Sequence, residues 1–386
     1  MNRILIFISL LLLSTSQFDL IAQYSKIGLL ILFAYNLIRT NKISYKFKNG
    51  LLIWGVMILS VFTSEDQITS LVRFLYSSIV ILSIIPLVIL YQRNPEKSLN
   101  QFFYLTSIWL LLNFLMIFSP LGYDNLGLFK GVTYNANTLG GVLSLLYLPL
   151  CIFKLQKRKS IINWVLLFTT ISIIFLTKSR SAALCVFFIL VIMLTINLKD
   201  KFKIILFSLL ITSSIVVSNF TFISQEFIKY FVKYEFLNQS SLLATRLGSW
   251  GVRIEAISRK PFFGWGFGVN PVFIDKDLSQ LYDVNVNPGN TEKGNSYLAT
   301  LEEFGLIIGL FIIILLFVII KRVYKNSNFK NPQSLIVIMV LLTGAIHASF
   351  ESWMFYIGSY SSLWFWFFLF IGLSNIKKKY LNGNKI

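Results

Sequence analysis

The chain alternates between long apolar runs and short polar connections. The runs lie at residues 3–16, 20–38, 50–63, 70–91, 101–118, 138–153, 161–176, 180–198, 203–219, 304–320, 334–350 and 359–376. A straight helix needs ~20 apolar residues to cross the hydrocarbon core of a bilayer, and most of these runs approach that length. The pattern therefore predicts an all-α polytopic membrane protein with about 12 transmembrane helices.

Composition supports a membrane location. Hydrophobic residues make up 56% of the 386 positions and charged residues only 13%, and the mean hydropathy is +0.72. A soluble chain could not bury so much apolar surface. The net charge of +19 would suggest nucleic acid as the partner of a soluble protein. Here the basic residues lie between apolar runs, so we interpret them as topological anchors and expect no nucleic acid.

Lysine and arginine gather in alternate connections. Basic clusters at 39–48, 93–97, 154–159, 199–203, 321–330 and 377–385 follow the even-numbered runs, whereas the odd-numbered connections carry few basic residues. Cytoplasmic connections are the basic ones. The pattern predicts a multi-pass protein of the inner (plasma) membrane with both termini in the cytoplasm. The two cysteines, Cys151 and Cys185, lie in apolar runs, which indicates buried thiols instead of a disulfide.

One long polar interval divides the chain into three predicted parts. These are an N-terminal transmembrane bundle at 1–219 with about nine spans, a large extracytoplasmic loop at 220–303 and C-terminal transmembrane helices at 304–386 with about three spans. Residues 225–236 have aromatic residues at helical spacing, which predicts an amphipathic helix on the membrane surface. A loop of this length is usually functional.

The stretch from Thr245 to Leu310 carries most of the candidate chemistry. Read as a helix, Arg246, Trp250 and Arg253 fall on one face. Two guanidinium groups a turn or two apart suit an anionic ligand such as a diphosphate. Pro261 ends this helix, and the glycine-rich run that follows lets backbone approach another segment or a ligand closely.

Four motifs lie in this part of the chain: an Arg-x-x-x-Trp beginning at Arg246, Pro-Phe-Phe-Gly-Trp-Gly-Phe-Gly over 261–268, Asn-Ser-Tyr-Leu over 295–298, and Glu-x-Gly-Leu-Ile over 303–307. Together they resemble the O-antigen ligase and polymerase family of membrane glycosyltransferases. The resemblance implies a GT-C-like fold in a bacterial membrane and an active site on the periplasmic or extracellular face. It further implies transfer of a glycan from undecaprenyl diphosphate, with arginines neutralising the leaving diphosphate and with no metal or other cofactor.

The cations that we expect to hold a diphosphate come from separate parts of the chain. Arg180 opens an apolar run, where the family also carries a Ser-Arg, and Arg73 lies near the outward start of another run. Arg246 matches the family motif, whereas Arg253 has no equally strong counterpart. Three of them also have an ordinary explanation: Arg180 and Arg73 as interfacial anchors, and Arg246 as part of a solvated helix face.

The general base is the least defined element. Family ligases carry a histidine where this chain has Gly294, so that role does not transfer. Glu292, Glu303 and His347 are the remaining candidates, and a partly desolvated carboxylate is suited to the task. Glu303 also fits as an acid near a helix N-terminus. His347 and Glu351 are i, i+4 neighbours that fit equally well as a structural pair.

We expect the sugars to contact polar and aromatic residues on the outward side. Asn137 resembles the family's Asn-x-x-Gly helix start, although it also fits as a helix cap. The remaining candidates for this role are Trp250, Asn295, Tyr297 and Glu351. The triplet Asp275-Lys276-Asp277 has a metal-binding spacing, but one such triplet is close to chance, and we expect no metal site.

The resemblance favours one activity over two others. A Phe-Glu followed by aromatics at 350–353 is similar to polymerases, which build O-antigen, capsule or exopolysaccharide from lipid-linked repeat units. The alternatives are a ligase that transfers finished glycan to a lipid or protein acceptor, and a polysaccharide flippase. The implied partners are an undecaprenyl-diphosphate-linked oligosaccharide, membrane lipids, and the chain-length regulator and flippase of the same pathway.

Overall fold

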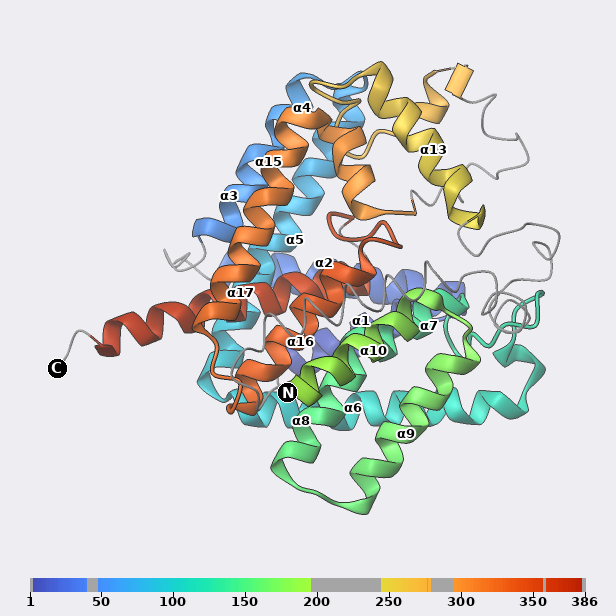
Figure 1. Cartoon of the computed structure of the whole chain (residues 1–386), viewed down its shortest axis with the longest axis vertical. Helices are drawn as coiled ribbons and strands as arrows, with labels where there is room; N and C mark the ends of the chain where they lie inside the picture. Colours follow the sequence, from blue (N-terminus) through green and yellow to red (C-terminus); the bar gives the residue numbers. More distant parts are fainter. Residues whose placement is uncertain are drawn as a thin grey trace.

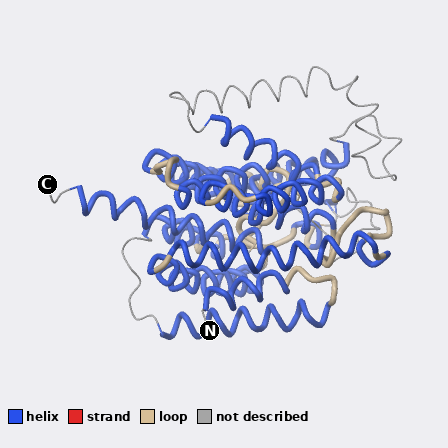
Figure 2. Tube along the Cα trace, turned by 90° about the horizontal axis from the view of Figure 1, so that it is seen from below, coloured by secondary structure: helices blue, strands red, loops and turns tan. Residues whose placement is uncertain are grey.

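The computed structural model describes residues 3–39, 48–195, 244–275, 277–278, 294–356 and 359–383. In these residues the fold is helical, and the extended pairings are two isolated bridges. Figure 1 shows the helices in one bundle, and Figure 2 shows them crossing the molecule in stacked rows. The main helices are α1 (Arg3–Leu13), α2 (Asp19–Arg39), α3 (Lys48–Met57), α4 (Leu59–Phe62), α5 (Gln67–Arg93), α6 (Pro95–Leu115), α7 (Ala136–Val142), α8 (Leu148–Lys157), α9 (Ile161–Leu176), α10 (Arg180–Thr195), α13 (Ala244–Arg259), α15 (Ser296–Asn326), α16 (Pro332–His347) and α17 (Tyr360–Gly383).

Helices occupy the apolar runs that the sequence predicts. The run at 203–219 and the amphipathic segment at 225–236 lie outside the described residues. Among the described residues, five helical stretches are long and apolar enough to cross a membrane, and six further apolar helices are shorter. The protein is therefore an all-α membrane protein, whereas the number of spans, the GT-C fold and the three-part division stay predictions.

The bundle is organised around α17. Its residues from Leu363 to Ile371 are almost completely buried, and the helix contacts α3, α5, α15 and α16. Trp366 packs edge-on against Trp54 of α3, and Trp364 packs in the same way against Phe102 of α6. A helix that is apolar all round needs neighbours on every side, so α17 occupies the centre. Outer helices such as α9 and α15 leave large apolar side chains exposed, as lipid-facing helices do.

The predicted outward connections lie together at one end of the bundle. Ser16 and Thr133 form a bridge between the first and fifth connections. The Glu65 N–H donates to the Trp265 carbonyl, which joins the third connection to the loop after α13. At the other end of α6 and α8, Lys157 pairs with Glu96 at 3.1 Å. This grouping is the one that an alternating topology requires, and the cellular side of each end stays a prediction.

The helix α15 is broken at Gly305, whose φ of 70° and ψ of 177° are not helical. The loop after α13 fills the break. The N–H groups of Trp265 and Gly266 donate to the carbonyls of Glu302 and Glu303 at 2.9 and 3.0 Å, and the Leu306 N–H donates to the Pro261 carbonyl at 2.6 Å. The loop thus replaces bonds that the helix loses.

Two glycines make this junction possible. A Cβ added at Gly264, where φ is 70°, would lie 2.5 Å from the backbone N of Gly305 and 2.7 Å from the Glu302 carbonyl oxygen. A Cβ at Gly305 would collide with the backbone of Phe262. Both positions therefore require glycine for their left-handed backbone and for the close approach of the two chains.

We predict that Gly264→Ala destabilises the protein by about 2 kcal/mol or more, because a left-handed alanine adds strain to the backbone clash. Thermal unfolding of the purified protein in detergent should show the loss. Gly251→Ala in α13 is the matched control, because a Cβ there meets nothing within 4 Å and alanine favours the helix. Equal unfolding temperatures for the two variants would contradict the claim that the contact between the loop and the break in α15 requires glycine at position 264.

Candidate functional site

The helix α13 brings the predicted arginine face against α15. It spans Ala244–Arg259 and ends just before Pro261, where the sequence predicts its end. Arg253 is fully buried, and its Nη1 lies 2.7 Å from Oε2 of Glu302, whose side chain is also 0% exposed. The same nitrogen lies 3.4 Å from Oδ1 of Asn270. This geometry favours a role for Arg253 in holding α13 on α15, because a guanidinium so enclosed must be paired.

The glycine-rich loop after α13 also contacts the start of α5. Ser64 Oγ donates to the Trp265 carbonyl at 3.3 Å, and Ser70 Oγ donates to the Phe267 carbonyl at 3.1 Å. A Cβ at Gly268 would lie 3.1 Å from Nε and Nη1 of Arg73. Arg73, which is exposed, therefore lies against this loop. The loop forms a bridge between α5 and α15.

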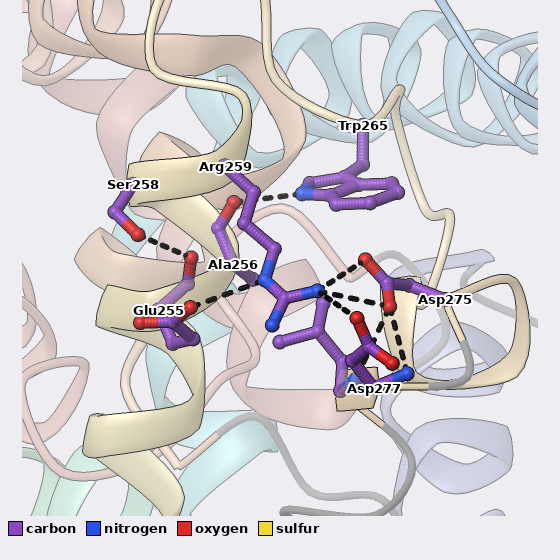
Figure 3. A network of polar contacts seen from close by, with 8 residues as sticks. Glu255, Ala256, Ser258, Arg259, Trp265, Asp275 and Asp277 are labelled. Carbon is purple, nitrogen blue, oxygen red and sulfur yellow. Dashed lines mark hydrogen bonds and ion pairs between the residues drawn. The ribbon is translucent and has the colours of Figure 1, made fainter.

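The outer side of α13 carries an exposed ion-pair network (Figure 3). The Arg259 Nε lies 3.1 Å from Oε1 of Glu255, and its Nη1 lies 2.9 Å from Oδ2 of Asp275 and 3.6 Å from Oδ2 of Asp277. The two aspartates of the D-x-D triplet thus face one guanidinium. Hydrogen bonds to Glu255 and Asp275 raise the pKa of Arg259 above its usual value. Desolvation acts to raise the pKa of Asp275, but hydrogen bonds from the Leu278 N–H and Arg259 hold it below its usual value.

A second group of motifs meets where α7, α10 and α16 converge. A Cβ at Gly140 would lie 2.9 Å from the Cβ atoms of Ser179 and Ala182. A Cβ at the neighbouring Gly141 would meet the Tyr360 hydroxyl and lie 3.4 Å from Nε2 of His347. The two glycines of α7 therefore bring the start of α10, the end of α16 and the start of α17 into contact.

His347 lies at the centre of this group and is 2% exposed. Its Nδ1 accepts a hydrogen bond from the Trp353 indole N–H at 2.8 Å, and its Nε2 lies 3.4 Å from Ser181 Oγ. An indole nitrogen can only donate, so Nδ1 carries no proton, and Nε2–H is the protonated nitrogen of the neutral ring. The imidazole is therefore arranged as a hydrogen-bond donor at Nε2, which disfavours its use as a base.

The first turn of α15 is fixed to the turn between α16 and α17. Ser296 Oγ donates to the Glu351 carbonyl at 2.7 Å and accepts from the N–H groups of Trp353 and Met354 at 3.0 and 3.1 Å. The Tyr297 hydroxyl donates to the Ala345 carbonyl at 2.7 Å. Asn295 Oδ1 caps the helix by accepting from the N–H groups of Tyr297 and Leu298. Asn295 and Tyr297 are thus engaged in structure.

The turn before α10 has an unusual backbone. Lys178 has a φ of 51°, the only positive value among the non-glycine residues that the structure describes. Arg180 follows as the first residue of α10, and it is half-buried. Residues in the left-handed region tend to occur where surrounding structure imposes a special conformation. The turn presents Arg180 and the N-terminus of α10 at the same end of the bundle as His347.

Of the other residues that the sequence predicts for the site, Glu351 lies next to His347, whereas Asn137 and Glu303 lie farther along their helices. Glu351 is 8% exposed, and its N–H donates to the His347 carbonyl at 3.1 Å, so it belongs to the group. Asn137 lies on the first turn of α7 and is partly exposed, whereas Asn135 forms the helix cap by accepting from the Thr138 N–H at 2.7 Å. Glu303 is 9% exposed and lies two turns along α15 from Ser296.

Helix α13 reaches the group through Trp250. The Trp250 Nε1 donates to the Gly294 carbonyl at 3.4 Å, next to the cap of α15. The backbone of Arg246 lies one turn earlier in α13, but its side chain lies outside the described residues, as does all of Glu292. The structure therefore places the helix that carries Arg246, and the diphosphate-binding role of its side chain stays a prediction.

Sequence reasoning missed three residues of the group. Ser181, Tyr360 and Trp353 contact His347 or its immediate surroundings. Ser181 adjoins Arg180 in sequence, and Trp353 adjoins the Phe-Glu motif, so proximity to motifs was the available signal. Nothing in the sequence pointed to Tyr360, because its position depends on how α17 crosses α7.

We predict that Glu302→Gln destabilises the protein by about 3–5 kcal/mol, because it leaves the enclosed Arg253 charge without its carboxylate. Unfolding in detergent measures the loss. The control is Glu255→Gln, which breaks the exposed pair with Arg259 and should change stability by about 1 kcal/mol or less. The double variant Arg253→Met, Glu302→Leu should recover most of the loss, and equal stability of the two single variants would refute the assignment.

Comparison with known families agrees with the motifs. Residues 165–314 match the family described as O-antigen ligase. No curated protein matches the chain significantly. The matched segment contains α10, α13, the glycine-rich loop and the broken part of α15. Over this segment the chain is similar to the O-antigen ligase family, which supports the resemblance carried by the motifs.

Proposed function

We propose that the protein is a polysaccharide polymerase that elongates a lipid-linked glycan at the outer face of the membrane. The donor is a glycan on undecaprenyl diphosphate, and the acceptor is a sugar hydroxyl of a second lipid-linked repeat unit. The hydroxyl oxygen bonds to the anomeric carbon, the bond from that carbon to the diphosphate oxygen breaks, and the diphosphate leaves on its lipid. The enzyme must stabilise the leaving charge and accept the hydroxyl proton.

One observation carries this proposal. Motifs at 134–140, 177–183, 294–297 and 345–353, which are far apart in sequence, are joined by direct contacts at one end of the bundle. Gly140 packs on Ser179, Ser181 lies beside His347, and Ser296 bonds to the turn after α16. Chemistry-bearing residues that converge in this way from several helices are typical of an active site within a helical bundle.

In this scheme Arg180 binds the diphosphate. A planar guanidinium donates two parallel hydrogen bonds to phosphate oxygens, and the N-terminus of α10 adds a positive helix dipole at the same place. His347 donates from Nε2 toward the leaving group or through Ser181. Arg246 on α13 and Arg73 beside the loop complete the cationic surroundings as further proposals.

We assign the role of base to Glu351. His347 presents a protonated nitrogen toward Ser181, because its other nitrogen accepts from Trp353. Glu303 lies at the break of α15, where its carbonyl binds Gly266. Glu351 is nearly enclosed, and its N–H donates to the His347 carbonyl. A carboxylate in desolvated surroundings is a stronger base than one in water. Asn137 and Trp250 are proposed to contact the sugars.

The description of the matched family supports a second candidate, a ligase that moves one finished glycan to a lipid or protein acceptor. Both activities need the same diphosphate site and the same kind of base, and they differ in the acceptor. Purified protein supplied with lipid-linked repeat units separates them. A polymerase makes a ladder of lengths, a ligase transfers one preformed chain only when its acceptor is present, and a flippase leaves glycan size unchanged.

We predict that Arg180→Ala lowers the rate of chain extension by about 100-fold or more, as loss of a fixed donor to developing negative charge does. Arg180→Lys should retain part of the rate, because it keeps the charge without the planar fork. Lys178→Asn, two residues away, is the matched control, since asparagine tolerates the left-handed backbone there. Polymer length is read on gels at equal membrane abundance, and unchanged long chains in Arg180→Ala would refute the site.

We predict that Glu351→Gln lowers extension by about 100-fold to 10,000-fold, the usual contribution of a general base. Donor binding should change little, so the loss falls on kcat and leaves KM for the lipid-linked unit nearly constant. Glu303→Gln provides the comparison at the other candidate carboxylate. A larger loss of kcat in Glu303→Gln than in Glu351→Gln would transfer the role of base to α15.

A further inference from the structure

Two neighbouring phenylalanines are exposed at the tip of the loop between α13 and α15. Phe262 is 63% exposed and Phe263 is 54% exposed, although the loop itself is well packed. Trp265 and Phe267, a few residues later, are each only 4% exposed. The loop therefore turns some of its aromatic residues inward and leaves this pair outside.

The position of the pair relative to α15 is defined by backbone contacts. A Cβ at Gly305 would lie 2.5 Å from the backbone N of Phe263, and Leu306 donates its N–H to the Pro261 carbonyl. The exposed apolar face of α15 begins at this point. It consists of Leu306, Ile307, Leu310, Phe311, Ile314, Phe317 and Val318, each of them 37–60% exposed.

The two residues adjoin the start of a surface that has the character of a lipid-facing one. The C-terminal part of α15 is one of the helices long and apolar enough to cross a membrane, and its exposed stripe has the composition of a lipid-facing surface. Phe262 and Phe263 extend that stripe past the break, onto a segment that is not part of the spanning helix. Polar residues would be expected there if the loop faced water.

The loop holds the rings in place before any contact with lipid. Its backbone is bonded to Glu302, Glu303 and Leu306 on one side and to Ser64 and Ser70 on the other. Lys260 pairs with Glu65, and its ammonium lies 4.5 Å from the centre of the Trp265 ring. A lysine beside exposed apolar rings is typical of the boundary between headgroups and acyl chains.

We propose that Phe262 and Phe263 insert into the acyl-chain region of the bilayer leaflet at this end of the bundle. The insertion is a contact with bulk lipid and does not depend on the proposed glycan transfer. Because the loop follows directly from α13, the insertion holds that helix close to the membrane surface. The pair acts as an anchor that sets the height of α13, and the break at Gly305 marks where α15 leaves the acyl region.

The test uses the full-length protein in phosphatidylcholine vesicles without substrate. The native Cys151 and Cys185 are both buried, so a cysteine added at an exposed position can be labelled selectively with an environment-sensitive bimane. Phe263→Cys and Phe262→Cys report on the loop. Ile314→Cys, which is 60% exposed in the middle of α15, is the lipid-facing reference, and Ser258→Cys on the exposed side of α13 is the aqueous reference.

Nitroxide groups on the acyl chains of the lipid should quench bimane at 262 and 263, as they quench it at 314. A nitroxide near the headgroup should quench the loop positions more than a deep one does, and the reverse should hold at 314. Aqueous iodide should quench position 258 and spare the loop. Quenching of the loop positions by iodide would overturn the insertion. Protection from both quenchers would also overturn it, by showing that protein covers the rings.

Discussion

The structure depends on how the break in α15 is closed. In a continuous helix the Glu302 carbonyl would accept the N–H of residue 306, but at Gly305 that bond is lost. Each buried backbone group left without a partner costs about 1–3 kcal/mol. The loop after α13 supplies the missing partners through Trp265, Gly266 and Pro261. Because the same loop binds Ser64 and Ser70, closing the break also joins α5, α13 and α15.

The junction at Gly305 determines where the buried ion pair between Arg253 and Glu302 forms. Breaking α15 leaves Glu302 on the short N-terminal half-helix, where Arg253 of α13 reaches it in a site closed to solvent. Such a pair contributes little net stability, but losing either member leaves an isolated buried charge. The pair therefore acts as a positional constraint that fixes the rotation of α13. Trp250, which is on the same face, is consequently directed to Gly294 at the start of α15.

The proposed active site depends on the close packing of α7 against α10, α16 and α17. Gly140 and Gly141 on α7 remove the side chains that would separate α7 from α10, α16 and α17. Ser181, His347 and Tyr360 can then gather, and the Trp353 indole selects the tautomer of the histidine. The catalytic assignment made for Glu351 comes from this arrangement, since a histidine whose Nδ1 accepts a hydrogen bond donates from Nε2. The α15 start, held by Ser296, connects this region to the junction at Gly305.

The sequence alone determined the helical class, the position of the described helices and the end of α13 before Pro261, because these depend on local hydrophobic pattern and backbone chemistry. Its short motifs also indicated the resemblance to the O-antigen ligase family, and it singled out Arg180, His347 and Glu351. Tertiary structure decided the role of Arg253. It shares a helix face with Trp250, but it is buried in an ion pair with Glu302 instead of facing a ligand site. Tertiary structure likewise assigned Asn295 and Tyr297 to helix capping and packing and brought Tyr360 beside Gly141. The periodicity of the sequence shows which face of a helix a residue occupies. The side chain that it contacts there belongs to another helix, distant in sequence, so only the fold decides that contact.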